Sequence, residues 1–106
     1  MHNFTDTQLT RVSELLQQIR VAQDDVWDAF ETSLMSDAKS SVYRIVSEVE
    51  KDVILPEQVK QEVLSIAKEA WDAIVGGGST EQRAQKSQAL LGKAERYIQQ
   101  ALENDK

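Results

Sequence analysis

Cysteine is absent from the 106-residue sequence, and histidine and proline occur once each, as His2 and Pro56. Without cysteine the chain has no disulfide, no thiolate zinc site, no iron–sulfur cluster and no thiol nucleophile. A single histidine removes the most common general base from consideration and leaves no second imidazole to share a metal ion. We therefore expect a protein that is not an enzyme and that needs no cofactor.

Long apolar stretches are missing as well, because the longest runs, at 53–55, 73–75 and 89–91, contain three residues each. A membrane-spanning helix needs about 20 apolar residues. The first ten residues also lack the positively charged and apolar regions of a secretory signal. We expect one domain over residues 1–106, no association with a membrane, and a cytoplasmic location.

Basic residues are outnumbered, with 12 lysines and arginines against 18 aspartates and glutamates, which gives a net charge of -6. This balance argues against broad affinity for phosphate backbones, which depends on clustered basic side chains. The excess of acidic residues is unevenly distributed along the chain. Residues 1–35 contain two basic and six acidic side chains, whereas residues 76–106 contain five basic and four acidic ones. The first helix is thus expected to be the acidic element and the last to be slightly basic.

The apolar residues that are present recur at helical spacing, with no clear alternation typical of a β-strand. They predict an all-α fold, an antiparallel four-helix bundle whose first and last helices are the longest. The predicted helices span 6–34, 37–54, 57–75 and 80–103. In the first helix the predicted core line is Leu9, Val12, Leu16, Ile19, Val26 and Phe30, widened by Leu15, Ala22 and Ala29; in the second it is Ala38, Val42, Ile45, Val49 and Val53.

Two capping boxes predict helix starts, because Thr5 and Ser79 are each followed three residues later by a glutamine, Gln8 and Gln82. Between them, Ser36-Asp37 is the expected cap of the second helix, and Leu55-Pro56 is expected to end it. Gly76-Gly77-Gly78 is expected to end the third helix by supplying left-handed backbone geometry. Asp24-Asp25 would also suit a helix start, so a first helix broken near 23–25 is left open.

Three carboxylates, Asp24, Asp28 and Glu31, lie on one face of the first helix, with Trp27 beside them. The group is interpreted as a solvated acidic face, a docking surface for a basic partner, or a divalent-metal site. Metal sites in helical bundles use Glu-x-x-His pairs from facing helices, which this chain lacks. Tryptophan is enriched in the energetically dominant part of protein interfaces, so Trp27 with its acidic rim is the candidate binding surface.

Trp71 occupies a similar position at the edge of the third helix's apolar stripe, and Tyr43 and Tyr97 flank theirs. Rings at such edges either cover the core or extend it into a binding surface. Trp71 is therefore added to the candidate partner-binding residues.

The leading functional hypothesis is a non-catalytic protein-binding module: a small acidic bundle that serves a larger protein as adaptor, accessory subunit or inhibitor. Its partner is expected to be another protein, with a basic surface favoured by charge complementarity. The alternative is a helical subunit of a nucleoprotein assembly. In that case the last helix would contact phosphates through Arg83, Lys86, Lys93 and Arg96.

Overall fold

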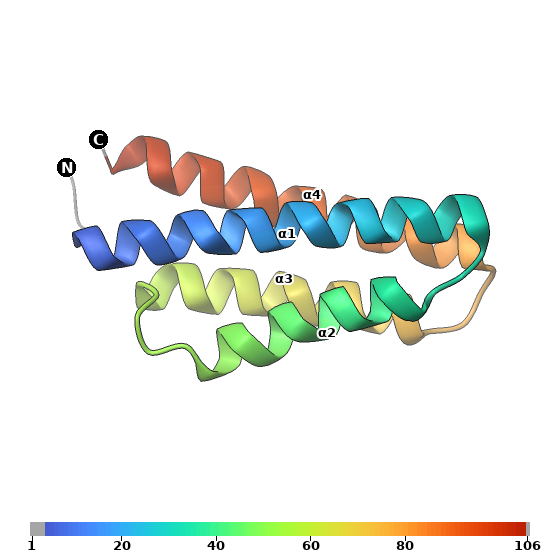
Figure 1. The fold of residues 1–106 in the computed structure, drawn as a ribbon. Coiled ribbons are helices and arrows are strands. Elements are labelled where there is room, and N and C mark those ends of the chain that lie inside the picture. Colours follow the sequence, from blue (N-terminus) through green and yellow to red (C-terminus); the bar gives the residue numbers. More distant parts are fainter. Residues whose placement is uncertain (1–3, 106) are drawn as a thin grey trace.

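The computed structural model describes residues 4–105, which form four helices. These are α1 (Asp6–Thr32), α2 (Ser36–Lys51), α3 (Glu57–Val75) and α4 (Thr80–Asn104). Successive helices run antiparallel (Figure 1), and contacts of α1 with α2, α2 with α3, α3 with α4 and α4 with α1 close a ring. The fold is an all-α four-helix bundle, as predicted, and α1 and α4 are its longest helices.

Both predicted capping boxes are present. The Thr5 hydroxyl accepts a hydrogen bond from the Gln8 backbone N–H at 3.1 Å, and the Gln8 side chain accepts one from the Thr5 N–H at 3.0 Å. Ser79 and Gln82 make the equivalent pair of bonds at the start of α4. Each box satisfies two backbone donors that would otherwise lack partners, which fixes where these two helices begin.

The first helix is continuous, so the alternative of a break near 23–25 is wrong. It ends at Thr32 rather than at 34, because Ser33 adopts left-handed geometry with φ of 62°. The buried face of α1 also differs slightly from the predicted core line, because Leu9, Leu16 and Phe30 are only partly buried. The fully buried residues of α1 are Val12, Leu15, Ile19, Ala22, Val26 and Ala29.

The second helix departs most from the prediction. Ser36 is its first helical residue rather than a cap, and the residue before it, Met35, makes no side-chain cap bond. The helix ends at Lys51 instead of 54, so Val53, expected in the core, is 93% exposed. Asp52 causes the early end, because its carboxylate accepts backbone hydrogen bonds that compete with helical ones.

The connection between α2 and α3 is organised around Asp52. Its Oδ1 accepts hydrogen bonds from the backbone N–H groups of Ile54 and Leu55, both at 2.7 Å. Its Oδ2 pairs with Arg11 Nε at 2.6 Å, and its backbone carbonyl accepts from Lys60 Nζ at 2.7 Å. These contacts tie α1, the connection and α3 together at one end of the bundle.

At the other end, the three glycines act differently from the prediction. Gly76, which ends α3, has extended backbone geometry with φ of -77°, and the left-handed residue is Gly78, with φ of 109°. The last turn of α3 is instead closed by Arg83 of α4, whose Nε donates to the Ile74 carbonyl at 2.9 Å. A cationic donor at a helix C-terminus satisfies a free carbonyl and interacts favourably with the helix dipole.

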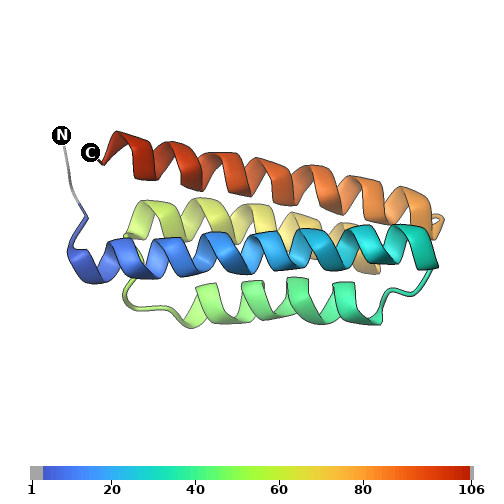
Figure 2. The same cartoon turned by 45° about the horizontal axis from the view of Figure 1, so that its top comes forward.

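The two ends of the described chain meet beside the α2–α3 connection (Figure 2). The Phe4 backbone N–H donates to Asp105 Oδ1 at 2.9 Å, and Asp105 is buried. Within residues 4–105, no helix has both the length and the apolar character needed to cross a membrane.

Candidate functional site

The acidic surface predicted on the first helix lies on the outside of the bundle. Asp24, Asp28 and Glu31 are exposed on α1, and none of the ion pairs among residues 4–105 involves them. Asp25, at the edge of this face, is turned toward α2 and accepts a hydrogen bond from the Ser41 hydroxyl. Within the described residues, these three carboxylates therefore have no ion-pair partner, and they face solvent along one side of α1.

Trp27 lies on the side of this acidic surface that faces α4. It is 54% exposed, and its ring stacks on that of Phe30, with centroids 5.5 Å apart and planes inclined by 14°. Phe30 in turn packs against the hydrophobic core. The stacked pair therefore carries apolar surface from the core out to solvent, and Trp27 is held by its neighbour rather than left free.

A groove of about 370 Å³ follows the seam between α1 and α4 at this point. Trp27 and Phe30 form its α1 wall, and its surface is mostly apolar. The α4 side combines small and glutamine side chains, and Arg96 marks the end farther from the α1–α2 connection. The lining residues are Val26, Trp27, Phe30, Ala84, Gln85, Gln88, Ala89, Gly92 and Arg96. We call this the α1/α4 groove.

Small residues on α4 keep the groove open. At Gly92 a Cβ atom would lie 3.4 Å from Arg96 Nη1 and 3.9 Å from Gln23 Nε2, so a larger side chain there would occupy space now shared by the two helices. Ala84 and Ala89 line the same side. The sequence pattern gave no direct sign of this groove, because it depends on which residues of α4 face α1.

Gln88 lines the groove, but its amide oxygen lies beneath the groove surface. Its Oε1 is buried and has no hydrogen-bond partner among residues 4–105. Burying an amide oxygen without a donor costs about 1 to 3 kcal/mol. A molecule in the groove would reach this oxygen only after the Gln88 side chain had turned outward.

Next to the groove, α1 and α4 are joined by an ion pair between Arg20 Nε and Glu95 Oε2 at 2.9 Å. The side-chain hydrogen bond from Arg20, assisted by one from Gln23 and opposed by burial, lowers the pKa of Glu95 below its ordinary value. The carboxylate of this pair belongs to α4 and the cation to α1. Because Arg20 pairs with a carboxylate of α4, it does not neutralise the acidic residues on its own helix.

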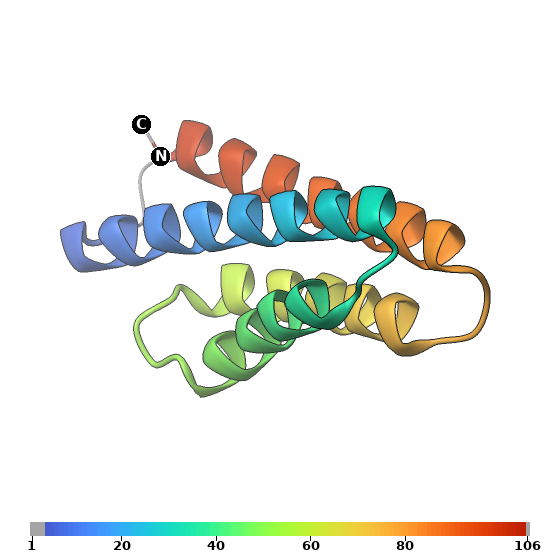
Figure 3. The same cartoon turned by 45° about the vertical axis from the view of Figure 1, so that its right-hand side comes forward.

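Trp71 is not part of this surface. It lies on α3, and its ring contacts Tyr43 of α2 with centroids 5.5 Å apart and planes inclined by 58°. Because α1 and α4 pack side by side across from α2 and α3 (Figure 3), the two aromatic pairs occupy opposite faces of the bundle. The structure thus separates two candidates that the sequence presented together.

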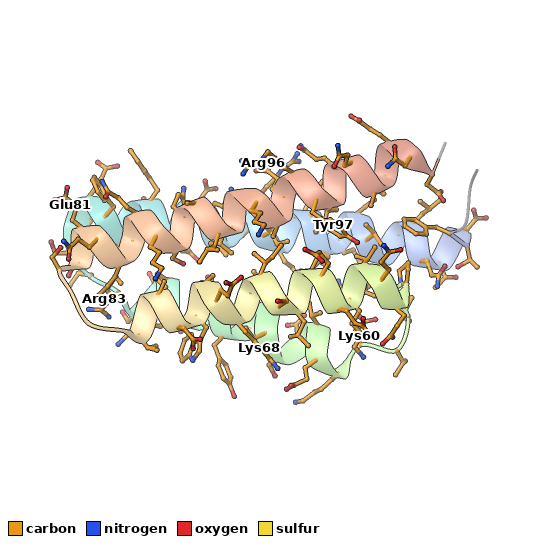
Figure 4. The ribbon with its side chains drawn as sticks, turned by 180° about the vertical axis from the view of Figure 1, so that it is seen from behind. Lys60, Lys68, Glu81, Arg83, Arg96 and Tyr97 are labelled. Carbon is orange, nitrogen blue, oxygen red and sulfur yellow. The ribbon has the colours of Figure 1, made fainter. Side chains whose placement is uncertain are left out.

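The four basic residues of α4 do not form one surface. Arg83 points toward α3, where it bonds the Ile74 carbonyl, and Arg96 lies on the other side of the helix (Figure 4). Lys86 and Lys93 are exposed. Tyr97, which also faces α3, has its pKa raised by burial and by the nearby Glu62 carboxylate.

A divalent-metal site has no support in the described part of the chain. No group of three or more histidine, cysteine, aspartate or glutamate side chains is arranged there to hold a metal ion. Asp24, Asp28 and Glu31 follow one another along a single helix, and no facing helix contributes a further ligand. The acidic surface is left with two interpretations, solvation and the docking of a basic partner.

Comparisons with known proteins do not assign the chain to a family. No protein-family model matches the chain. Searches of curated proteins and of solved structures gave no significant match.

Proposed function

We propose that this protein is a non-catalytic protein-binding module whose α1/α4 groove receives an apolar side chain from a basic segment of another protein. The observation that carries the proposal is the combination of an apolar groove, walled by the stacked Trp27–Phe30 pair, with three unpaired carboxylates on the adjoining face of α1. Aromatic residues supply most of the binding energy in many protein interfaces, and a charged rim supplies orientation and speed of encounter.

The partner's chemistry follows from what surrounds the groove. Its apolar anchor would lie against Trp27, and lysine or arginine side chains would face Asp24 and Asp28. Arg96 would repel a basic residue at its end of the groove and favour an acidic one there. Such a module acts by binding its partner rather than by catalysis, and it would serve as an adaptor, an accessory subunit or an inhibitor.

The test compares variants in affinity capture from the native host, with the captured proteins identified by mass spectrometry. Wild type is expected to capture a partner that Asp24→Lys/Asp28→Lys and Trp27→Ala both lose, because each change removes one feature of the site while altering only exposed residues. Glu69→Lys/Asp72→Lys is the matched control, since it makes the same charge change at exposed positions on α3.

Filling the groove gives an independent check. Ala89 is exposed and lines the groove, so Ala89→Phe is expected to leave the fold intact and to abolish capture of the same partner. If all three site variants captured that partner as well as the control does, the assignment to this surface would be wrong.

The nucleic-acid alternative predicts a different result. A subunit that contacts phosphates through Lys86, Lys93 and Arg96 would bind single- or double-stranded nucleic acid about tenfold or more weakly when salt rises from about 50 to about 200 mM. The purified protein is expected to show no such binding, because Arg83 is already engaged by α3 and the surface is acidic elsewhere. Steeply salt-dependent binding that Lys86→Glu/Lys93→Glu removes would favour the alternative.

A further inference from the structure

A second exposed aromatic surface lies on the face formed by α2 and α3. Tyr43 is 57% exposed over Trp71, and Val75, farther along α3, is 44% exposed. The partly buried Val46 and Leu64 pack against the core, and helical spacing places them on the same faces as Tyr43 of α2 and Trp71 of α3. We call these five residues the α2/α3 strip. Lys68, which lies between Leu64 and Trp71 on the same face of α3, reaches across the strip to Glu50 of α2.

The charges beside the strip are of both signs, whereas those on the α1 face beside the α1/α4 groove are all acidic. On α2, Lys39, Tyr43, Val46 and Glu50 are separated by four, three and four residues, which places them along one face of the helix. Lys39 and Glu50 are both exposed. Glu50 Oε2 lies 3.6 Å from Lys68 Nζ, and both of these side chains are more than half exposed, so this pair stays accessible to a second molecule.

The order of these four residues is complementary to itself. When two copies of α2 pack antiparallel about a two-fold axis between Tyr43 and Val46, Tyr43 of each copy faces Val46 of the other. The same register places Lys39 of each copy opposite Glu50 of the other. These two charge contacts lie about 16 Å from each other along the helix axis, one on each side of the two-fold axis. A two-fold interface requires such self-complementarity, because each contact occurs twice.

We propose that the α2/α3 strip is a dimer interface and that its occupant is a second copy of this chain. Two apolar contacts and two opposite-charge contacts form across the axis, with Trp71 and Val75 covering the sides. The acidic faces of α1 lie on the far sides of the two bundles, where their mutual repulsion is weakest. The proposal does not depend on the α1/α4 groove having a ligand.

The direct test is sedimentation equilibrium of the purified chain. An interface centred on one short helix gives weak association, so the protein is examined from about 10 μM to about 1 mM at about 0.15 M ionic strength. We expect the average mass to rise from 12.0 kDa toward twice that value. A chain that remains monomeric at the highest concentration overturns the proposal.

Charge exchange tests the register. Lys39→Glu alone and Glu50→Lys alone each place like charges opposite one another, so either variant is expected to weaken association about tenfold or more. The double variant Lys39→Glu/Glu50→Lys, and an equimolar mixture of the two single variants, restore opposite charges across the axis. Because Glu50→Lys also removes the ion pair with Lys68 of the same chain, both are expected to associate more strongly than either single variant, though not fully as wild type does. A change that acted only through folding would show no such rescue.

The matched controls are Lys86→Glu and Glu81→Lys, which make the same charge changes at exposed positions on α4. They are expected to leave association unchanged. Single variants that associate as strongly as the controls, or association that Trp27→Ala abolishes, would locate self-association elsewhere and overturn the proposed interface.

Discussion

The guanidinium of Arg11 lies 2.6 Å from the carboxylate of Asp52, which joins the start of the first helix to the connection between α2 and α3. Both side chains are largely buried, at 13% and 8% exposure. The same carboxylate holds the backbone N–H groups of Ile54 and Leu55. One acidic side chain therefore ends a helix, shapes the connection and attaches it to α1.

Replacing Asp52 is expected to destabilise the fold by about 2 to 3 kcal/mol, because Arg11 and two backbone donors lose their acceptor together. Chemical denaturation of Asp52→Ala measures this loss. Arg11→Ala is expected to cost less, since Asp52 keeps its backbone donors. The exposed pair of Arg44 and Glu48, 4.0 Å apart, is the control, and Arg44→Ala should change the free energy of unfolding by less than about 0.5 kcal/mol.

Acid is expected to weaken the fold through Asp52 and Glu95. Burial acts to raise the pKa of Asp52, but hydrogen bonds from the Leu55 and Ile54 backbones and from Arg11 outweigh it, so the pKa is lowered. The pKa of Glu95 is lowered mainly by its hydrogen bond from Arg20. A carboxyl whose pKa is lower in the folded state contributes stability above its unfolded pKa, which is about 4.

The free energy of unfolding should therefore be steady near neutral pH and decrease below about pH 4, as protons bind the two carboxylates. Denaturation curves recorded across this range test the direction. In Asp52→Asn the decrease should be shallower than in wild type, although the variant is less stable at neutral pH. An equally steep decrease in this variant would show that Asp52 does not contribute to the acid dependence.

Two of the three glycines before α4, Gly77 and Gly78, are expected to differ in their tolerance of alanine. Gly78 has φ of 109°, and a Cβ there would lie 2.9 Å from Gln82 Oε1, which belongs to the capping box. Gly78→Ala should cost about 1 to 2 kcal/mol through backbone strain. Nothing lies within 4 Å of a Cβ at Gly77, so Gly77→Ala should remain within about 0.5 kcal/mol of wild type. Urea denaturation of the two variants makes the comparison, and equal stabilities would contradict it.

Ser33 is the opposite case, a position at which glycine is expected to increase the stability of the fold. Its φ of 62° is the left-handed geometry that ends α1, and a residue with a Cβ pays about 1 to 2 kcal/mol there. Glycine avoids this strain but loses more chain entropy on folding, so Ser33→Gly is expected to stabilise the protein by about 0.5 kcal/mol. Ser33→Val, with its branched Cβ, is expected to lower the melting temperature, and the reverse order of the two variants would contradict the assignment of strain.

The helix starts could be predicted where the signal is local. Thr5 with Gln8, and Ser79 with Gln82, form bonds within one turn of helix, so their spacing alone identifies them. The end of α2 could not be predicted in the same way. The apolar spacing continues to Val53, but the helix stops at Lys51 because the Asp52 carboxylate accepts the N–H groups of Ile54 and Leu55. Arg11, 41 residues away, holds that carboxylate in place.

The candidate site was predictable in part for the same reason. Asp24, Trp27, Asp28 and Glu31 share a helix, so their common exposed side follows from helical spacing. The groove beside Trp27 needs Ala89 and Gly92 of α4, and the separation of Trp71 from Trp27 needs the order of helices around the ring. Neither the groove nor the separation of the two tryptophans can be predicted from the spacing of residues along one helix.

The hydrogen bond between the Phe4 N–H and Asp105 Oδ1 places the two ends of the described chain within reach of a short peptide bridge. Linking them and opening the backbone at Gly77, which is exposed and lies in a connection, would give a circular permutant that keeps all four helices. Such a permutant begins with α4 and ends with α3, and connections of this kind tolerate new termini well. The bundle is in this sense a closed ring of helices, whose architecture does not require the chain to start at α1.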